Sequence, residues 1–213
     1  MPVPLVPLKA LADAKGRLAP FLSAIERRLL ALAMFEDVVA TLQAVPGLER
    51  PAVVSPDREV WRRAEAIGCR ALAEPGGGLN AALVAAAEGL GGQGGVLVVA
   101  ADLPLASPDA LARVLAAAGP APVVVVPSRD GAGTNVLAWR DTASFRPAFG
   151  PGSAARHLAA PGAVRLDEPG LALDVDTAED LRAAAGRLDP DGVTGRRLRE
   201  LRLGERLAGH ETR

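Results

Sequence analysis

The sequence predicts an α/β protein whose mostly parallel sheet is flanked by helices in three layers. Residues 96–101 and 123–126 are wholly apolar, which is typical of strands that are buried on both faces. Such runs alternate with segments of helical periodicity from the start of the chain, as they do in parallel sheets. The chain has 213 residues and is 49% hydrophobic, so we expect one domain at 1–187 and a small tail at 188–213.

The first part of the chain is expected to alternate between strands and helices. Residues 3–8 form the first predicted strand, although two prolines weaken its ladder. Ser23 and Glu26 have the spacing of a capping box, which predicts a helix that runs to about residue 43. The elements predicted next are a strand at 52–55, a helix at 56–67 and a strand at 69–73.

Glycine, proline and capping residues divide the remainder of the chain. Residues 74–78 form a glycine-rich loop that opens a helix at 79–90, and Ser107 caps another helix. Beyond Arg129 the elements become shorter and the loops longer. The elements predicted there are strands at 136–139, near 164–166 and at 171–175, and helices at 153–160 and from Thr177 onward.

Composition limits the partners and the compartment of the protein. A net charge of −1 gives no overall attraction to nucleic acid or to a membrane. Cys69 is the only cysteine, which excludes an internal disulfide and a cysteine-based zinc cluster. The sequence shows neither a secretion signal nor a stretch of about 20 apolar residues. We therefore expect a cytoplasmic protein that acts on small molecules.

The tail differs from the rest of the chain because it is rich in arginine. Its leucines, Leu198, Leu201, Leu203 and Leu207, have heptad-like spacing. We expect a solvated helix that is partly disordered. A contact between two copies in a homodimer is one role for such leucines.

The two lysines are the most unusual feature of the composition. Lys9 and Lys15 are the only lysines beside 22 arginines, and both follow the first predicted strand. A compact ammonium on a flexible stem suits a phosphate group that needs a point charge rather than a bidentate partner. Coincidence in a lysine-poor protein is the alternative interpretation.

Three aspartates are candidates for a cation site. Asp102 follows the most apolar strand, at the place where open α/β sheets bind their ligands, and a carboxylate buried there needs a cation. Asp174 and Asp176 are two residues apart, so in a strand both would point to one face. Such oxygen ligands suit Mg²⁺. Capping of a turn or helix is the alternative for Asp102 and Asp176.

Glycine-rich loops at 131–134 and 150–153 are candidates for anion binding. The second loop leads through Ser153 into a helix whose free N–H groups favour a phosphate or a carboxylate. His157, on the same helix, fits a hydrogen-bonded structural histidine or one at the edge of the substrate better than a general base. No Gly-x-Gly-x-x-Gly follows a strand and no P-loop motif occurs, which argues against dehydrogenases and P-loop enzymes. Together, the lysines, aspartates and loops indicate metal-assisted nucleotidyl transfer.

Seven short motifs occur in order between about residue 3 and residue 181. They are Val6-Pro-Leu-Lys9, Ala14-Lys-Gly-Arg-Leu18, Gly78-Leu-Asn80, Asp102-Leu-Pro104, Gly133-Thr-Asn135, Phe149-Gly-Pro-Gly-Ser153 and Leu173-Asp-Val-Asp-Thr177. This set resembles the 2-phospho-L-lactate guanylyltransferase family, whose bacterial branch includes the phosphoenolpyruvate guanylyltransferases of coenzyme F420 biosynthesis. The resemblance implies a nucleotide-diphospho-sugar transferase-like (GT-A/Rossmann-like) fold, GTP as donor and Mg²⁺ as cofactor.

The resemblance also assigns roles around the nucleotide. Lys9, Lys15 and Arg17 match the loop that embraces the GTP phosphates, with Lys15 as a catalytic residue. Gly78 and Asn80 match the region near the nucleoside. The family pattern has a hydroxyl residue where this chain has Gly16, whose backbone N–H can still approach a phosphate.

The remaining matched residues concern the acceptor and the metal. The acceptor is a small phosphorylated carboxylic acid, phosphoenolpyruvate or 2-phospho-L-lactate, and its matched positions are Thr134, Gly150 and Ser153. The matched metal positions are Asp102, which is also catalytic, Asp174 and Asp176. The acceptor phosphate would attack the α-phosphorus of GTP and release pyrophosphate. Because a phosphomonoester is largely dianionic at neutral pH, no general base is required.

Two other functions fit the same motifs. One is a molybdenum-cofactor guanylyl- or cytidylyltransferase, and the small anion pocket at Thr134 and Ser153 argues against its bulky pterin. The other is a non-catalytic nucleotide-binding regulator with the same fold. The sequence does not choose between phosphoenolpyruvate, 2-phospholactate and 3-phosphoglycerate.

Overall fold

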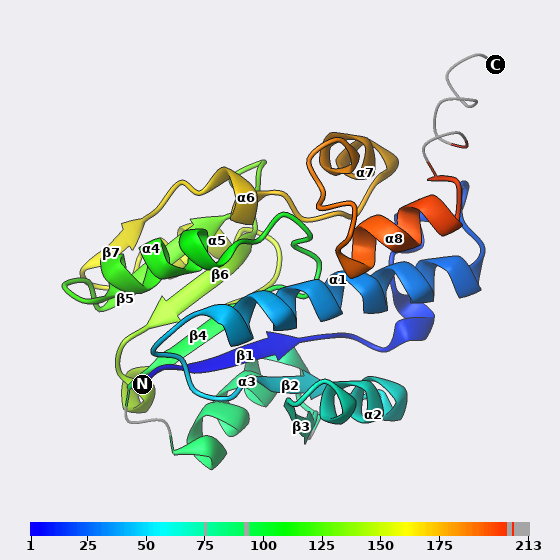
Figure 1. Cartoon of the computed structure of the whole chain (residues 1–213). Helices are drawn as coiled ribbons and strands as arrows, with labels where there is room; N and C mark the ends of the chain where they lie inside the picture. Colours follow the sequence, from blue (N-terminus) through cyan, green and yellow to red (C-terminus); the bar gives the residue numbers. More distant parts are fainter. Residues whose placement is uncertain (75, 92–93, 204–205, 207–213) are drawn as a thin grey trace.

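The fold is a single mixed sheet of seven strands with helices on both faces. The computed structural model describes residues 1–74, 76–91, 94–203 and 206. Its strands are β1 (Val3–Pro7), β2 (Ala52–Ser55), β3 (Arg70–Ala73), β4 (Val96–Val99), β5 (Val123–Pro127), β6 (Thr134–Trp139) and β7 (Ala163–Arg165). They lie in the order β3-β2-β1-β4-β6-β5-β7 (Figure 1).

Eight α-helices and three short 3₁₀ segments belong to the described part of the chain. The helices are α1 (Ala24–Ala44), α2 (Arg58–Ala66), α3 (Gly78–Leu90), α4 (Pro108–Ala118), α5 (Ser153–Leu158), α6 (Pro169–Ala172), α7 (Ala178–Ala185) and α8 (Val193–Glu200). The 3₁₀ segments are η1 (Leu11–Asp13), η2 (Gly16–Leu18) and η3 (Thr142–Ser144). The predicted capping box begins α1, with the Ser23 hydroxyl accepting from the Glu26 N–H. Among the described residues, no helix has the length and apolar character that crossing a membrane requires.

Strand direction explains how the site residues meet. β1 pairs in parallel with both β2 and β4, so these strands end at the same edge of the sheet. β6 is antiparallel to β4 and to β5, so it begins where β4 ends. The sequence predicted a mostly parallel sheet, which is confirmed, but it did not predict the reversed strand.

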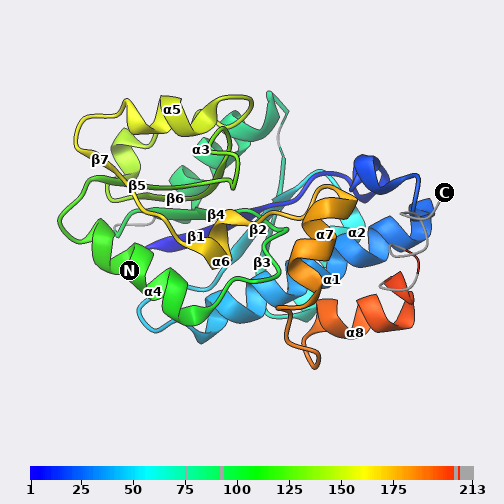
Figure 2. The same cartoon turned by 90° about the horizontal axis from the view of Figure 1, so that it is seen from above.

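Neighbouring residues of each strand point into different cores. On one face, residues such as Val6, Leu97 and Val124 pack against α1, α2 and α4. On the other, residues such as Leu5 and Val98 pack against α3, and Figure 2 shows α3 and α5 on that side of the sheet, opposite α1 and α4. This arrangement confirms the predicted three layers and explains why the strands are apolar on both faces.

Two sequence predictions need correction. The strand predicted at 171–175 is absent, because the chain makes the short helix α6 and then continues without strand pairing. The alternation of Leu171, Leu173 and Val175 comes from burial in two different core clusters rather than from a pleated strand. The helix predicted in the tail is present as α8, but it packs on α1 and buries Leu198 instead of lying in solvent. Leu207 lies outside the described residues.

Candidate active site

A cavity of about 640 Å³ opens at the edge of the sheet where β1 and β4 end. Asp102 reaches it from the turn after β4, and Thr134 reaches it from the first position of β6. The segment after β1 supplies Lys9, Lys15 and Arg17, and Asp176 comes from the loop before α7. Ligands of open α/β sheets bind in this type of crevice.

Lys15 connects three distant parts of the chain. Its ammonium Nζ donates to Asp102 Oδ2 at 2.5 Å and to Asp176 Oδ1 at 2.9 Å. The Lys15 side chain is only 7% exposed, whereas those of Asp102 and Asp176 are 26% and 44% exposed. Two carboxylates that face the cavity therefore converge on one buried cation.

The charges of this cluster shift the pKa values of its members. Burial lowers the pKa of Lys15, but the charges and hydrogen bonds of the two aspartates outweigh burial and leave that pKa raised. Burial raises the pKa of Asp176, but Lys15, Arg17 and Lys9 outweigh it and leave that pKa lowered. Both shifts favour the charged forms, so the ion pair is present at neutral pH.

The backbone of the lysine loop is held in an unusual conformation. Lys15 has φ 52° and ψ 41°, in the left-handed region that non-glycine residues rarely occupy. The Asp57 carboxylate accepts from the Leu11 N–H at 3.0 Å, and the Arg27 guanidinium donates to the Leu22 carbonyl at 2.9 Å. These anchors lie on both sides of Lys15, and they hold the loop that aims its ammonium. The sequence did not indicate a role for Asp57 or Arg27. An aspartate at a helix N-cap and an arginine on a helix are common, and neither pattern shows which loop the side chain will bind.

Asp174 lies beside the cluster but faces another partner. Its Oδ1 accepts from Asn135 Nδ2 at 3.2 Å, and the same amide donates to the Leu171 and Ala172 carbonyls. Burial, with Asp102 and Asp176 nearby, raises the pKa of Asp174. The strand geometry expected to align Asp174 with Asp176 is absent, and Asp174 does not line the cavity.

The carboxylates suit a divalent cation of the kind that nucleotidyl transfer generally uses. No group of three histidine, cysteine or acidic residues within the described ranges is arranged to hold a metal. Asp102 and Asp176 nevertheless converge on a cation, and in this structure that cation is the Lys15 ammonium. Mg²⁺ is commonly held by one or two carboxylates together with substrate phosphates. The donor set therefore fits a metal that arrives with a nucleotide.

A buried polar group forms the other wall of the cavity. Ser153 Oγ donates to Thr134 Oγ1 at 3.1 Å, and Thr134 Oγ1 lies 2.9 Å from His157 Nδ1. The Ala148 N–H donates to His157 Nε2 at 2.8 Å. Burial, with a smaller effect from Arg156, lowers the pKa of His157 to about 4. His157 is therefore neutral at neutral pH and has hydrogen-bond partners at both ring nitrogens, which agrees with the interpretation that it is not a general base.

The backbone N–H groups of the first glycine loop are used within the protein, whereas the second loop is marked by a glycine in an unusual backbone conformation. In the 131–134 loop the N–H groups of Gly131, Ala132 and Gly133 donate to Ser128 or Asp130, so this loop offers the Thr134 hydroxyl rather than an amide nest. In the 150–153 loop, Gly150 has φ 123°, which only glycine adopts readily. The expectation of a flexible anion-binding backbone at 131–133 is therefore wrong.

Asn80 joins α3 to the second of these loops. Its side-chain oxygen accepts from the Phe149 N–H at 2.8 Å, and its amide donates to the Phe149 carbonyl at 3.1 Å. Contact of Asn80 with a nucleotide stays a prediction. Leu79 and Phe149 also line the cavity; both lie in motifs of the family resemblance, but the sequence assigned no role to either side chain.

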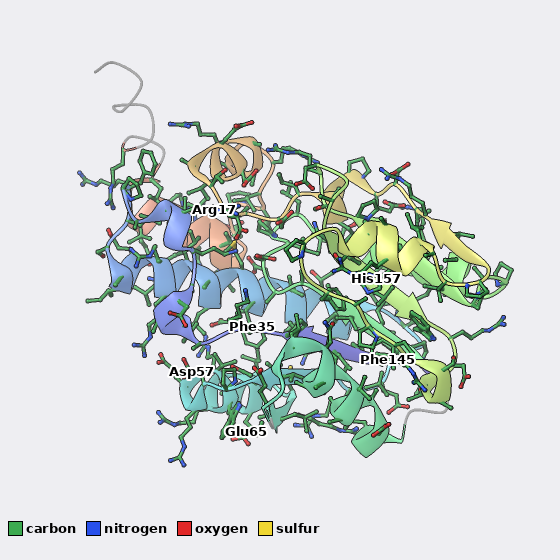
Figure 3. The ribbon with its side chains drawn as sticks, turned by 180° about the vertical axis from the view of Figure 1, so that it is seen from behind. Arg17, Phe35, Asp57, Glu65, Phe145 and His157 are labelled. Atoms are coloured by element: carbon green, nitrogen blue, oxygen red, sulfur yellow. The ribbon has the colours of Figure 1, made fainter. Side chains whose placement is uncertain are left out.

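The structure brings together about half of the predicted site residues. Six of them line the cavity, namely Lys9, Lys15, Arg17, Asp102, Thr134 and Asp176. Five lie outside the lining, namely Gly78, Asn80, Gly150, Ser153 and Asp174. Gly16 also lines the cavity, and a Cβ added there would meet nothing within 4 Å, so the hydroxyl residue of the family pattern would fit. Figure 3 shows Arg17 near η2 and His157 on α5.

Comparison with solved structures confirms the predicted fold. A putative nucleotide-diphospho-sugar transferase from Desulfovibrio desulfuricans G20 superimposes with a TM-score of 0.77 over 99% of each chain, at 18% sequence identity. At this identity the likeness concerns the fold alone.

Sequence comparison defines the family. Phosphoenolpyruvate guanylyltransferase from Nocardia farcinica is 45% identical over 189 residues, which cover 84% of this chain and 83% of the relative. Phosphoenolpyruvate guanylyltransferase from Streptomyces coelicolor is 44% identical over 186 residues, which cover 84% of this chain and 87% of the relative. Residues 3–185 match the family described as "Guanylyl transferase CofC like". With the cavity, its cations and its paired carboxylates, these matches show that the chain belongs to the CofC-like guanylyl transferases, a family of nucleotidyltransferases.

Proposed function

We propose that this protein transfers GMP from GTP to the phosphate of phosphoenolpyruvate and releases pyrophosphate, as a step of coenzyme F420 biosynthesis. The observation that carries the proposal is the cavity in which Lys15 joins Asp102 and Asp176 opposite the hydroxyl of Thr134. Its wall offers cations and metal ligands on one side and a neutral hydrogen-bonding group on the other. The names of the relatives support phosphoenolpyruvate as the acceptor.

The nucleotide would bind on the side of the lysine loop. Lys15 and Arg17 would neutralise the triphosphate, with Lys9 at the end of β1 as a third cation. Gly78 and Asn80 would lie near the nucleoside, at the start of α3. The exposed side chain of Arg17 could turn toward a phosphate, and Lys15, whose ammonium has three donors and gives two to the aspartates, would have one donor left for it.

Asp102 and Asp176 would hold Mg²⁺, and Asp174 is a third candidate ligand beside them. When bound, Mg²⁺ would supply charge neutralisation at the reacting phosphate and at the departing pyrophosphate. Lys15 would remain positively charged and close to the oxygens of the reacting phosphate and of the pyrophosphate. The raised pKa of Lys15 supports this role, since the side chain stays charged throughout the neutral range.

The chemistry needs positioning more than proton transfer. An oxygen of the acceptor phosphate attacks the α-phosphorus of GTP in line, and the bond between the α-phosphorus and the bridging oxygen to the β-phosphate breaks. A phosphomonoester is already largely dianionic at pH 7, so no side chain has to remove a proton. The neutral, fully bonded His157 supports a mechanism without a histidine base. Positioned cations would offset the repulsion between the two anions.

The acceptor would lie against Thr134, Gly150 and Ser153. Thr134 borders the cavity, and Ser153 supports it from behind. A molybdenum pterin is far larger than a three-carbon phosphoacid, and no feature of this wall favours it. The preference for phosphoenolpyruvate over 2-phospholactate or 3-phosphoglycerate depends on contacts as small as one methyl or hydroxyl group.

The test is an assay of pyrophosphate release with GTP, Mg²⁺ and each of the three acids. We expect turnover with phosphoenolpyruvate to exceed that with the other acids, and we expect ATP and CTP to be poor donors. Asp102→Asn should lower turnover by about 100-fold or more, because it removes a metal ligand and a partner of Lys15. Asp109→Asn, an exposed change at the start of α4, is the matched control.

Two results would contradict the proposal. Full pyrophosphate release by Asp102→Asn would remove the metal assignment. Faster turnover of another acid would replace the acceptor but leave the nucleotidyltransferase assignment intact.

A further inference from the structure

A continuous hydrogen-bonded chain of buried groups ends at the acceptor side of the cavity. It runs from the Ala148 N–H through both nitrogens of His157 to the hydroxyls of Thr134 and Ser153. His157 is 1% exposed, Ser153 is 2% exposed and Thr134 is 8% exposed. Of these side chains, only Thr134 lines the cavity.

One end of this chain has a fixed direction. A backbone N–H can only donate, so Nε2 of His157 must accept the hydrogen of Ala148. A neutral imidazole that accepts at Nε2 carries its hydrogen on Nδ1. That hydrogen can only be donated to Thr134 Oγ1, which lies 2.9 Å away. The lowered pKa of His157 agrees with the neutral ring.

The hydrogen that His157 donates also determines the direction of the hydrogen bonds at the two hydroxyl groups. Thr134 Oγ1 accepts from His157 with one lone pair and from Ser153 with the other. An oxygen whose lone pairs are both used can make a further hydrogen bond only through its own hydrogen. The bond between the two hydroxyls runs from Ser153 to Thr134, so the spare hydrogen belongs to Thr134, whose side chain lines the cavity. A reversed bond would put the spare hydrogen on Ser153, which does not line the cavity, and would leave Thr134 with a lone pair for the ligand.

We propose that His157 is a positioning residue that forces the Thr134–Ser153 pair to present a hydrogen, rather than a lone pair, to the acceptor. The subsite then selects a ligand group that only accepts hydrogen bonds, such as a carboxylate or a phosphate. It rejects an amine or an ammonium at the same place. The proposal deepens the function given above and depends on it for the identity of the acceptor.

A purely structural role is the alternative, because His157 also supports the neighbouring loop. Its ring meets the Phe149 ring edge-on at a centroid distance of 4.9 Å, and its bond to Ala148 holds the segment before Gly150. Two conservative variants separate these roles. The amide of asparagine lies near the position of Nδ1, and the amide of glutamine lies near the position of Nε2.

Of the two variants, His157→Asn should keep the better affinity for phosphoenolpyruvate, and His157→Gln should be the more stable. His157→Asn keeps a donor to Thr134 and loses the bond to Ala148, so it should be the less stable variant. We expect its KM for phosphoenolpyruvate to stay within about threefold of the unmodified protein. His157→Gln keeps the acceptor for Ala148 and loses the donor, so its KM for phosphoenolpyruvate should rise about tenfold or more. The KM for GTP should not change in either variant.

A double-mutant cycle tests whether His157 acts through Thr134. Thr134→Val should raise the KM for phosphoenolpyruvate by itself, and adding His157→Gln to it should cause little further loss. Additive effects would show that the two residues act independently and would overturn the proposal. The proposal would also be overturned if the less stable of the two single variants, Asn or Gln, were also the one with the weaker affinity for phosphoenolpyruvate.

The tautomer can be measured without any substrate. In protein labelled with ¹⁵N-histidine, we expect His157 at pH 7 to show a protonated Nδ1 and an unprotonated Nε2. His210 is the only other histidine, and His210→Gln assigns the signals. The opposite tautomer, or a charged ring, would overturn the proposal. If no phosphoacid supported turnover, the proposed function would fail, while this measurement would still decide whether His157 donates to Thr134 as the proposal requires.

Discussion

Lys15 combines a costly backbone with a buried charge, and both point to function. A left-handed non-glycine residue costs on the order of 1 kcal/mol, and such strain persists where the surroundings hold it in place. The side chain is 7% exposed and bridges carboxylates from two other parts of the chain. Lys9, by contrast, is exposed and lines the cavity rim. The two lysines that stood out in the composition therefore have different environments.

Lys15→Gln should reduce turnover far more than stability. We expect kcat/KM for GTP to fall about 100-fold or more, because a cation at the reacting phosphates is lost. The free energy of unfolding should fall by no more than about 3 kcal/mol, since both aspartates remain partly in contact with water. Pyrophosphate release and chemical denaturation measure the two effects. Arg62→Gln, at an exposed cation of α2, is the control.

If folded Lys15→Gln kept normal turnover, Lys15 would be a structural counter-ion only. The phosphates would then depend on Lys9 and Arg17. A collapse of stability with unchanged activity of the folded fraction would lead to the same conclusion.

His157 should make the stability of the protein depend on pH. Its pKa is lowered from 6.5 to about 4 in the folded protein, mainly by burial. Between these values the unfolded chain binds a proton that the folded protein does not, so stability falls as pH decreases from about 6.5 to 4. We expect a loss that approaches about 1.4 kcal/mol per pH unit near pH 5.

Denaturation curves at pH 7, 6 and 5 measure this dependence. His157→Gln cannot titrate, so its stability should change less over the same range. Equal slopes in both proteins would show that His157 is protonated in the folded state and would also weaken its assigned tautomer.

At the scale of the elements, the helices that surround the lysine loop come from both ends of the chain. α8 packs on α1, and the Asp37 carboxylate of α1 accepts from the N–H groups of Val193 and Thr194 at the start of α8. Leu198 belongs to the same core cluster as Leu18 and Leu22 of the lysine loop. The α8 helix therefore contributes to the packing around the loop that carries Lys15.

Leu198→Ala should destabilise the protein and weaken nucleotide binding together. The cavity left in the core should cost about 2–4 kcal/mol of unfolding free energy. Loosening of the loop should raise the KM for GTP severalfold while the KM for the acceptor stays constant, because Thr134 belongs to a different part of the core. Arg199→Ala, exposed on the same helix, should change neither quantity. Equal loss of affinity for both substrates would show that α8 has no specific link to the lysine loop.

Periodicity and capping predicted most elements, and failed where direction or pairing matters. The capping box at Ser23 and Glu26 involves residues three apart, so the sequence contains the whole interaction. The direction of β6 depends on which strands lie beside it. A run of apolar residues does not indicate whether a strand is parallel or antiparallel to its neighbours. Residues 171–175 alternate like a strand because they bury side chains in two clusters, and nothing in the pattern reveals the missing partner strand.

At the scale of the whole molecule, the end of the sheet brings cations, carboxylates and the Thr134 hydroxyl into one cavity of about 640 Å³. The charged side of the cavity is built from the segment after β1, from Asp102 after β4 and from Asp176 between α6 and α7. The side with the Thr134 hydroxyl depends on β6 and α5. Both sides meet because β6 runs against β4, which brings its first residue to the edge where β4 ends.

Mg²⁺ and GTP should stabilise the whole protein together rather than separately. With Lys15 between the two carboxylates, Mg²⁺ alone should change the melting temperature by less than about 1 °C. Mg²⁺ with GTP at about 100 times its Kd should add roughly 2.7 kcal/mol, or about 5–10 °C for a chain of this size. Thermal unfolding measures both effects.

EDTA should abolish pyrophosphate release. Undiminished activity in EDTA would exclude a metal role for Asp102 and Asp176.

The sequence by itself determined the layer architecture, the candidate cations and carboxylates, and the motifs along the chain, because these depend on local pattern and residue chemistry. Only the tertiary structure decided which of them meet. Lys15 lies 87 residues from Asp102 and 161 from Asp176, and no local pattern states that three such segments converge. The same holds for the contact of His157 with Thr134, which requires α5 to pack on β5 and to reach the first residue of the reversed strand β6. The physical reason is that burial and periodicity specify the face of each element, whereas contacts between distant side chains depend on how all the elements pack.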